Sequence, residues 1–242
     1  THGDEPAGVQ ALEVVASHFE NQEWQIDGID IFGVVGNPNA FAQNTRFVEQ
    51  NLNRMLQDKY LLDTTSQISE VKRGQELSEY FKQLQNEYEK VFIFDVHSVS
   101  MSDIQMTLAR TQDFESQELL KKISPIKLNF VFQEEYIPGT VSGYASSIGC
   151  VGFGIEAGSH ASPNAKFVAL EIIEAFLDEV AKFSTKTISY KNIPTYVEGE
   201  PRTYTTIERI VPRKGFHFTL SPESELFLKS GQVYAYDDEF GD

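Results

Sequence analysis

The chain has 242 residues, enough for one large domain with a substantial core or for a domain with a smaller appendage. Its 36 acidic and 20 basic residues give a net charge of −16, which argues against nucleic acids and anionic membrane surfaces as partners. A single cysteine, Cys150, excludes an intrachain disulfide, and we expect it to be a small buried hydrophobic residue. No apolar run approaches the roughly 20 residues of a membrane-spanning helix. With no visible signal peptide, we expect a cytoplasmic protein.

In the first half of the chain, helical and strand-like patterns alternate. Apolar residues recur at helical spacing over residues 5–20, and the largely apolar run of residues 29–35 predicts a buried strand. Residues 43–54 are polar without a clean period, so we expect an ordered loop of the kind that often carries function. A long helix is predicted for residues 69–90. The apolar run that follows, residues 91–94, is typical of a central parallel strand that is buried on both faces.

The same alternation continues to about residue 183. Residues 104–108, 128–132 and 150–155 have the composition of strands, whereas residues 114–123 and 164–183 have helical periodicity. Strands that alternate with helices predict an α/β fold, with a mixed, largely parallel sheet and helices on both of its faces.

After residue 185 the character of the sequence changes. Short β-type runs divided by proline and glycine predict a small all-β domain over residues 186–242, following an α/β domain over residues 1–185. The runs are residues 187–190, 202–207, 216–220 and 233–236.

Polar residues that suit a metal site stand at the predicted ends of the sheet. His2 and Glu5 are three residues apart where a helix begins, a pair that on its own is more often an exposed helix start. His97 and Glu156 each follow a strongly apolar strand, and sites in open α/β sheets lie beyond the carboxyl ends of the strands. His2, Glu5 and His97 would hold a zinc ion and leave a position for water, while Glu156 would transfer protons. Asp95, on the same side of the strand as His97, would orient the His97 ring.

Five segments of the chain, in this order, resemble the succinylglutamate desuccinylase/aspartoacylase family, which belongs with the zinc carboxypeptidases. The run of residues 231–235 also resembles the closing β-domain of that family. The five segments are His2-Gly3-Asp4-Glu5, Gly36-Asn37-Pro38, Arg46 with Asn51-Leu52-Asn53-Arg54, Asp95-Val96-His97 and Gly154-Ile155-Glu156-Ala157-Gly158. The resemblance implies a zinc-carboxypeptidase-like fold and a hydrolase that cleaves the amide of an N-acyl amino acid.

The resemblance also implies roles for single residues. It implies one zinc ion per chain on His2, Glu5 and His97, with Glu156 as the general acid/base. Arg46 would stabilise the oxyanion of the tetrahedral intermediate. These implied roles agree with the chemistry, because an arginine beside a metal can meet the negative charge that develops in the transition state.

For the substrate, the resemblance implies that Asn53 and Arg54 bind its carboxylate. A guanidinium fork matches a carboxylate in a bidentate way that lysine does not reproduce. The chain departs from the family where the family's Asp-Leu-Asn-Arg begins with Asn51 instead. Residues 144–149 contain no basic residue, although the aspartoacylase branch has an arginine there, which argues against N-acetylaspartate as the substrate. Tyr144 is a candidate contact for the acyl group.

Family members carry a strand before the first motif and more β-structure after the last one, so we expect further residues before Thr1 and after Asp242. The predicted β-domain would cover the mouth of the site and favour small substrates. The expected partner is a small anionic N-acyl amino acid, and the oligomeric state, homo-oligomers included, is left open. Two alternatives also remain open: a zinc carboxypeptidase that acts on peptides, and a non-catalytic homologue that binds a metal or ligand.

Overall fold

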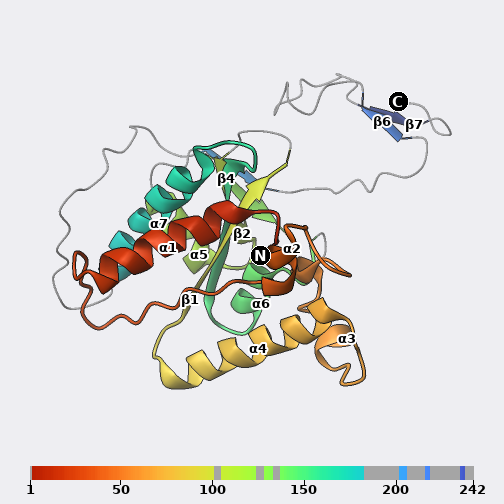
Figure 1. The fold of residues 1–242 in the computed structure, drawn as a ribbon, viewed down its shortest axis with the longest axis horizontal. Helices are drawn as coiled ribbons and strands as arrows, with labels where there is room; N and C mark the ends of the chain where they lie inside the picture. The colour runs from red at the N-terminus through yellow and green to blue at the C-terminus, as the bar shows by residue number, and fades with distance from the viewer. Residues whose placement is uncertain are drawn as a thin grey trace.

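The computed structural model describes residues 2–100, 105–123 and 137–182 in full, and the backbone of four short strands elsewhere. Its main feature is a five-stranded sheet (Figure 1). The β1–β4, β2–β3 and β3–β5 pairs are parallel and the β4–β2 pair is antiparallel, which confirms the predicted mixed, largely parallel sheet. In spatial order the strands are β1 (Phe92–Val99), β4 (Val151–Ser159), β2 (Gln105–Arg110), β3 (Leu128–Phe132) and β5 (Arg202–Thr205).

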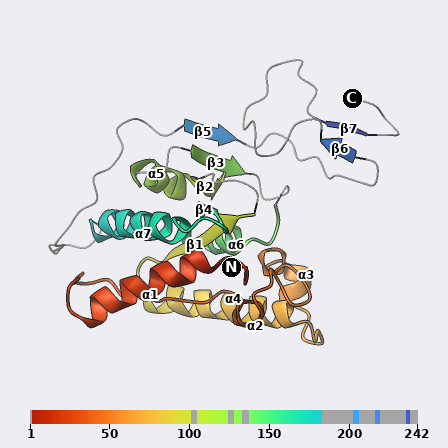
Figure 2. The same ribbon diagram turned by 45° about the horizontal axis from the view of Figure 1, so that its top comes forward.

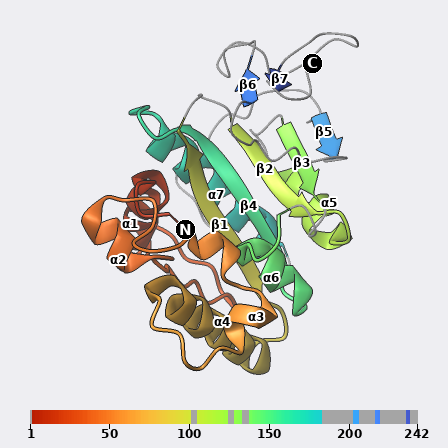
Figure 3. The same ribbon diagram turned by 90° about the vertical axis from the view of Figure 1, so that its right-hand side faces the viewer.

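Helices cover both faces of the sheet and bury its apolar side chains in two core clusters. On one face lie α1 (Pro6–Glu20), α5 (Phe114–Lys122) and α7 (Ala165–Ala181), with α1 and α7 side by side (Figures 1 and 2). On the opposite face from α7 lie α6 (Val141–Ser147) and α4 (Ser69–Glu87) (Figure 3). Four of these helices, α1, α4, α5 and α7, confirm the helices expected from apolar periodicity.

Strand β4 lies at the centre of the packing because both of its faces are covered. Phe153 and Ile155 are completely buried in the core cluster that includes α7, and the Phe153 ring lies 5.3 Å from that of Phe176. On the other face, a Cβ added to Gly152 would lie 2.3 Å from the backbone oxygen of Ser142 in α6. Only glycine allows α6 to approach the strand so closely.

Two strand predictions are wrong. Residues 29–35 form no strand in the part of the chain that the structure describes, and Ile31, Phe32 and Val34 are 37%, 50% and 38% exposed. Strand β1 lies at the edge of the described sheet rather than at its centre. An apolar run has the composition of a strand, but a strand also needs a neighbour for its backbone hydrogen bonds.

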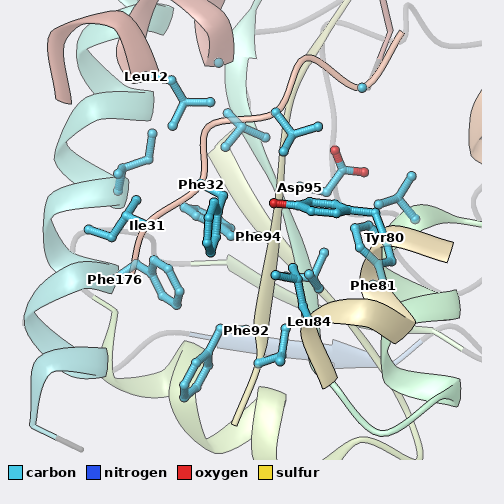
Figure 4. A pocket seen from close by; sticks show the side chains of 18 of the residues that line it. Leu12, Ile31, Phe32, Tyr80, Phe81, Leu84, Phe92, Phe94, Asp95 and Phe176 are labelled. Carbon is cyan, nitrogen blue, oxygen red and sulfur yellow. The ribbon is translucent and has the colours of Figure 1, made fainter. Parts of the chain in front are cut away.

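An apolar groove of about 590 Å³ lies between β1 and residues 28–37 (Figure 4). The side chains that line the groove include Leu12, Leu84, Phe94 and Phe176. At one end the lining becomes polar, with Asp95, His2 and Glu5. The groove therefore runs along β1 towards the candidate site.

Several short helical elements were not predicted, because they are too short to show a period. They are α6, α2 (Pro38–Gln43), the 3₁₀ helix η1 (Leu52–Arg54) and α3 (Asp58–Leu61). Side-chain caps stabilise two of them. Asn37 Oδ1 accepts a hydrogen bond from Ala40 N at the start of α2, and Thr140 Oγ1 accepts one from Gly143 N at the start of α6.

Most of the predicted β-domain, including the run at 187–190, lies outside the described residues. Of the rest, β6 (Phe216–Phe218) pairs antiparallel with β7 (Ala235–Asp237), while β5 pairs with β3 and extends the main sheet. The domain boundary near residue 185 stays a prediction. Among the described helices, none combines the length and apolar character needed to cross a membrane.

Candidate metal and catalytic site

Three side chains from distant parts of the chain converge beside the edge strand β1. Glu5 Oε1 lies 2.7 Å from His2 Nδ1, and Glu5 Oε2 lies 2.7 Å from His97 Nδ1. All three residues are buried, and each offers a ligand atom within 4.8 Å of the others. The structure thus brings together the three residues that the sequence predicts as metal ligands.

The turn before α1 makes this convergence, rather than the first turn of the helix. Helix α1 begins at Pro6, so both His2 and Glu5 precede it. Gly3 lies between them and packs directly on α2, where an added Cβ would lie 2.1 Å from the carbonyl carbon of Ala40. Gly3 N also donates a hydrogen bond to Arg46 O, at 3.3 Å. Glycine therefore lets the turn lie against the loop that carries Arg46.

The far side of each imidazole ring is held by an acceptor. His2 Nε2 lies 2.9 Å from Asn51 Oδ1, whose identity as oxygen follows from a second hydrogen bond that it accepts from Asn53 N. His97 Nε2 lies 2.8 Å from Asp95 Oδ2, the contact through which Asp95 is predicted to orient the ring. Asn51 Oδ1 assigns a hydrogen to Nε2 of His2, and both rings direct Nδ1 at Glu5.

The charges around this cluster favour a cation. Burial opposes ionisation of Glu5, but His97 and His2 outweigh it and hold the Glu5 pKa well below its ordinary value. Burial lowers the pKa of His2. Burial also opposes charging of His97, yet the neighbouring carboxylates of Asp95 and Glu5 raise its pKa to about 10. Two imidazole nitrogens and a buried carboxylate that point at one another suit a divalent metal such as zinc. In the metal-free protein, a proton on His97 supplies part of the positive charge that balances the Glu5 carboxylate.

Glu156 lies next to His97, on the neighbouring strand. The two residues are register partners in the β1–β4 ladder, and both sit inside their strands rather than beyond the ends. Glu156 Oε2 is buried without a hydrogen-bond partner in the described part of the chain. Burial, with repulsion from Glu5 and Asp95, raises the Glu156 pKa to about 7. A carboxyl group with this pKa can both accept and donate a proton near neutral pH.

Arg46 reaches the same cluster from the loop after α2. Its Nη1 donates a hydrogen bond to Glu5 Oε1 at 3.0 Å, while 45% of its side chain is exposed. The guanidinium therefore contacts Glu5 while part of it faces solvent.

The other predicted substrate contacts take part in interactions within the protein. Asn53 Nδ2 lies 3.1 Å from His97 Nε2, and Asn53 Oδ1 accepts a hydrogen bond from Val141 N. Arg54 Nη1 donates to Asn53 O. The Tyr144 hydroxyl lies 2.5 Å from Ser78 Oγ within the core. For these three residues, substrate binding stays a prediction.

Some residues around the site carried no clear signal in the sequence. His160 Nδ1 lies 2.7 Å from Ser98 Oγ, and His160 forms with Asp4 and Glu5 a second group of closely spaced potential ligands. Glu70 is completely buried and binds the loop between Arg46 and Asn51. Spacing along the chain does not reveal such contacts, because they form between elements that meet only in the fold. Cys150 is buried and burial raises its pKa to about 11, as expected for an inert thiol.

Comparison with known proteins places this geometry in context. Residues 1–183 match the model of the succinylglutamate desuccinylase/aspartoacylase catalytic domain. Among solved structures, a succinylglutamate desuccinylase from Vibrio parahaemolyticus has a TM-score of 0.75 at 18% identity, with 100% of this chain and 71% of that chain covered. The corresponding enzyme from Vibrio cholerae has a TM-score of 0.75 at 17% identity, covering 99% and 70%. Murine aminoacylase 3 has a TM-score of 0.57 at 18% identity, covering 74% and 63%.

Proposed function

The chain belongs to the succinylglutamate desuccinylase/aspartoacylase family, and from this premise we propose that it is a zinc-dependent hydrolase that cleaves the amide bond of an N-acyl amino acid. The observation that carries the proposal is the position of Glu156. Its buried Oε2 has no hydrogen-bond partner among the described residues, and the residue stands beside His97, one member of a buried group of three potential metal ligands. A non-catalytic metal site has no need of a buried carboxyl with a pKa of about 7.

The proposed roles in the reaction follow from these positions. His2, Glu5 and His97 hold one zinc ion, which when bound would polarise the acyl carbonyl and lower the pKa of a water molecule. Glu156 takes a proton from the attacking water and later delivers a proton to the leaving nitrogen. Arg46, already 3.0 Å from Glu5 Oε1, donates to the oxyanion that develops on the carbonyl oxygen.

Recognition of the amino acid is assigned to the η1 region. Asn53 and Arg54 bind the substrate carboxylate, and Tyr144 contacts the acyl group after its hydroxyl leaves Ser78. A substrate with a free carboxylate gains a local cationic contact from Arg46 and Arg54, which a protein with a net charge of −16 needs. The missing basic residue in 144–149 argues against N-acetylaspartate. N-succinyl amino acids are the class to test first, because succinylglutamate desuccinylases are among the similar solved structures.

A hydrolysis screen tests the proposal. The purified chain with added zinc is incubated with N-acetyl amino acids, N-succinyl amino acids and short peptides, and release of the free amine is measured. We expect turnover of N-acyl amino acids. Turnover of peptides alone would favour the carboxypeptidase alternative, and zinc binding without any turnover would favour the non-catalytic homologue.

The variant Glu156→Gln links the activity to this site. It should keep stoichiometric zinc and lose activity by roughly 10²–10⁴-fold, the usual contribution of general acid–base catalysis. Glu13→Gln, which neutralises an exposed carboxylate on α1, is the matched control and should keep full activity. Equal activity of Glu156→Gln and the parent would refute the mechanism.

A further inference from the structure

Glu70 is a buried carboxylate in the first turn of α4, with 0% of its surface exposed. Its oxygens accept hydrogen bonds from three successive backbone N–H groups. Oε1 lies 2.6 Å from Val48 N, and Oε2 lies 3.2 Å from Glu49 N and 3.1 Å from Gln50 N. The side chain of Asn37 donates a further hydrogen bond to Oε1 at 3.1 Å.

The loop that Glu70 binds has little burial of its own. Residues 42–49 are all exposed, including the large apolar side chains of Phe47 and Val48, at 40% and 38%. A loop with few buried apolar contacts is expected to open locally at low free-energy cost. The converging hydrogen bonds to one buried carboxylate are therefore the main restraint on the backbone of residues 48–50.

Both ends of this restrained loop contact the metal-ligand turn. On one side, Arg46 Nη1 donates to Glu5 Oε1 and Arg46 O accepts from Gly3 N. On the other side, Asn51 Oδ1 accepts from His2 Nε2. The loop backbone thus positions Arg46, which is proposed to meet the oxyanion, and Asn51, which orients the His2 ring.

We propose that Glu70 is a positioning residue, which holds the loop of residues 46–51 so that Arg46 and Asn51 stay on the metal-ligand turn. The catalytic part of this inference rests on the proposed function, because it needs the role assigned to Arg46. The mechanical part does not, because it concerns only the loop and the turn.

The carboxylate form is essential to this role. Burial opposes ionisation of Glu70, but the N–H groups of Val48, Gln50 and Glu49 and the amide of Asn37 outweigh it and lower its pKa. A glutamine would have the same shape with a single acceptor oxygen, and its NH₂ group would face backbone N–H donors. Hydrogen bonds to a charged acceptor are also about twice as strong as neutral ones.

Hydrogen exchange tests the mechanical part on the full chain without any substrate. In Glu70→Gln, we expect the amides of residues 48–50 to exchange about tenfold to a hundredfold faster, as follows from losing charge-assisted hydrogen bonds. Exchange in α7 and β4 should stay unchanged. Glu79→Gln removes an exposed carboxylate from the same helix and should leave the loop as protected as in the parent. Unchanged protection in Glu70→Gln, or faster exchange throughout the molecule, would overturn the proposal.

A double-mutant cycle tests the catalytic part. Glu70→Gln should lower kcat/KM about 10–100-fold with zinc content unchanged, the size expected for misplacing a group by about 1 Å. In an Arg46→Ala background the same change should cost less, by a factor of about three or more, because only the Asn51–His2 contact is then left for Glu70 to position. Equal losses in both backgrounds would show a general structural role and overturn the proposal.

Asn37→Ser provides a second variant if Glu70→Gln does not fold. Serine keeps a cap for α2 but loses the donor to Glu70, so exchange at residues 48–50 should rise by a smaller factor in the same direction. No rise would count against the proposal. If the parent hydrolyses none of the substrates, the proposed function fails, whereas the exchange measurement still decides whether Glu70 holds the loop.

Discussion

Three glutamates in this protein show how the surroundings of one residue type set its chemistry. Glu5 lies between two imidazoles, and Glu70 lies among N–H donors, so both have lowered pKa values. Glu156 has an oxygen without a partner in the described part of the chain, and burial, with repulsion from neighbouring carboxylates, raises its pKa to about 7. The first two suit permanent charge, as in a ligand or an anchor, and the third suits proton transfer.

This contrast predicts that Glu156 destabilises the metal-free protein at alkaline pH. Because its folded pKa is raised above its unfolded value, the folded state loses stability as the pH rises from about 4.5 to about 7 and gains none back above that range. In chelator at pH 8, Glu156→Gln should raise the free energy of unfolding by roughly 1–3 kcal/mol. The gain should shrink towards zero near pH 4.5.

Urea denaturation at pH 8, 6.5 and 5 measures this effect, with Glu13→Gln as the control for removal of an exposed charge. A gain from Glu156→Gln that is the same at every pH would contradict the raised pKa.

At the scale of single elements, β4 shows how a strand accommodates a helix on one face and a core on the other. Its residues alternate between the α7 side, with Phe153 and Ile155, and the α6 side, with Gly152 and Gly154. The two glycines differ in the room around them. A Cβ at Gly152 would lie 2.3 Å from Ser142 O, whereas one at Gly154 would have its nearest neighbour at 3.4 Å, the Asp95 backbone oxygen.

We therefore expect Gly152→Ala to be far more destabilising than Gly154→Ala. The first must push α6 away from the sheet, at a cost of roughly 2–4 kcal/mol, and the second should stay within about 1 kcal/mol of the parent. Urea denaturation of both variants measures the difference. Similar losses for the two alanines would mean that the close approach of α6 to β4 does not matter for stability.

For the whole molecule, the metal-ligand cluster joins the turn before α1 to the edge strand β1. The cluster buries Glu5 with two histidines, and without a metal the charge balance depends on a proton held by His97. A cation bound to the folded state alone adds stability by mass action. The tertiary structure and the metal should therefore depend on one another.

Addition of zinc should raise the melting temperature of the chelator-treated protein by about 5–10 °C at a free zinc concentration of about 100 times Kd. His97→Gln should abolish this shift. His18→Gln changes a partly exposed histidine of α1 that binds Glu23, away from the cluster, and should keep it. Differential scanning calorimetry measures all three proteins, and a full zinc shift in His97→Gln would exclude the proposed ligand set.

Most helices and strands could be predicted because apolar periodicity is a local property. Helices α1, α4, α5 and α7 each span several turns, which is enough for a pattern to appear. The short α2 and α6 depend on a capping side chain and on contacts with distant segments, so they leave no pattern. The strand prediction for residues 29–35 is wrong for the opposite reason. Their composition favours a strand, but composition says nothing about whether a neighbouring strand is available for pairing.

By itself, the sequence determined the α/β class, the residue types of the site and their order, because these depend on local pattern and on side-chain chemistry. His2, Glu5, His97 and Glu156 could be assigned to one sheet edge because the topology of alternating strands and helices leaves few other places for them. The tertiary structure alone decided which nitrogens face the cluster and how Glu70 holds the Arg46 loop. Most of these hydrogen bonds join residues far apart in the chain, and their directions exist only once the elements have packed.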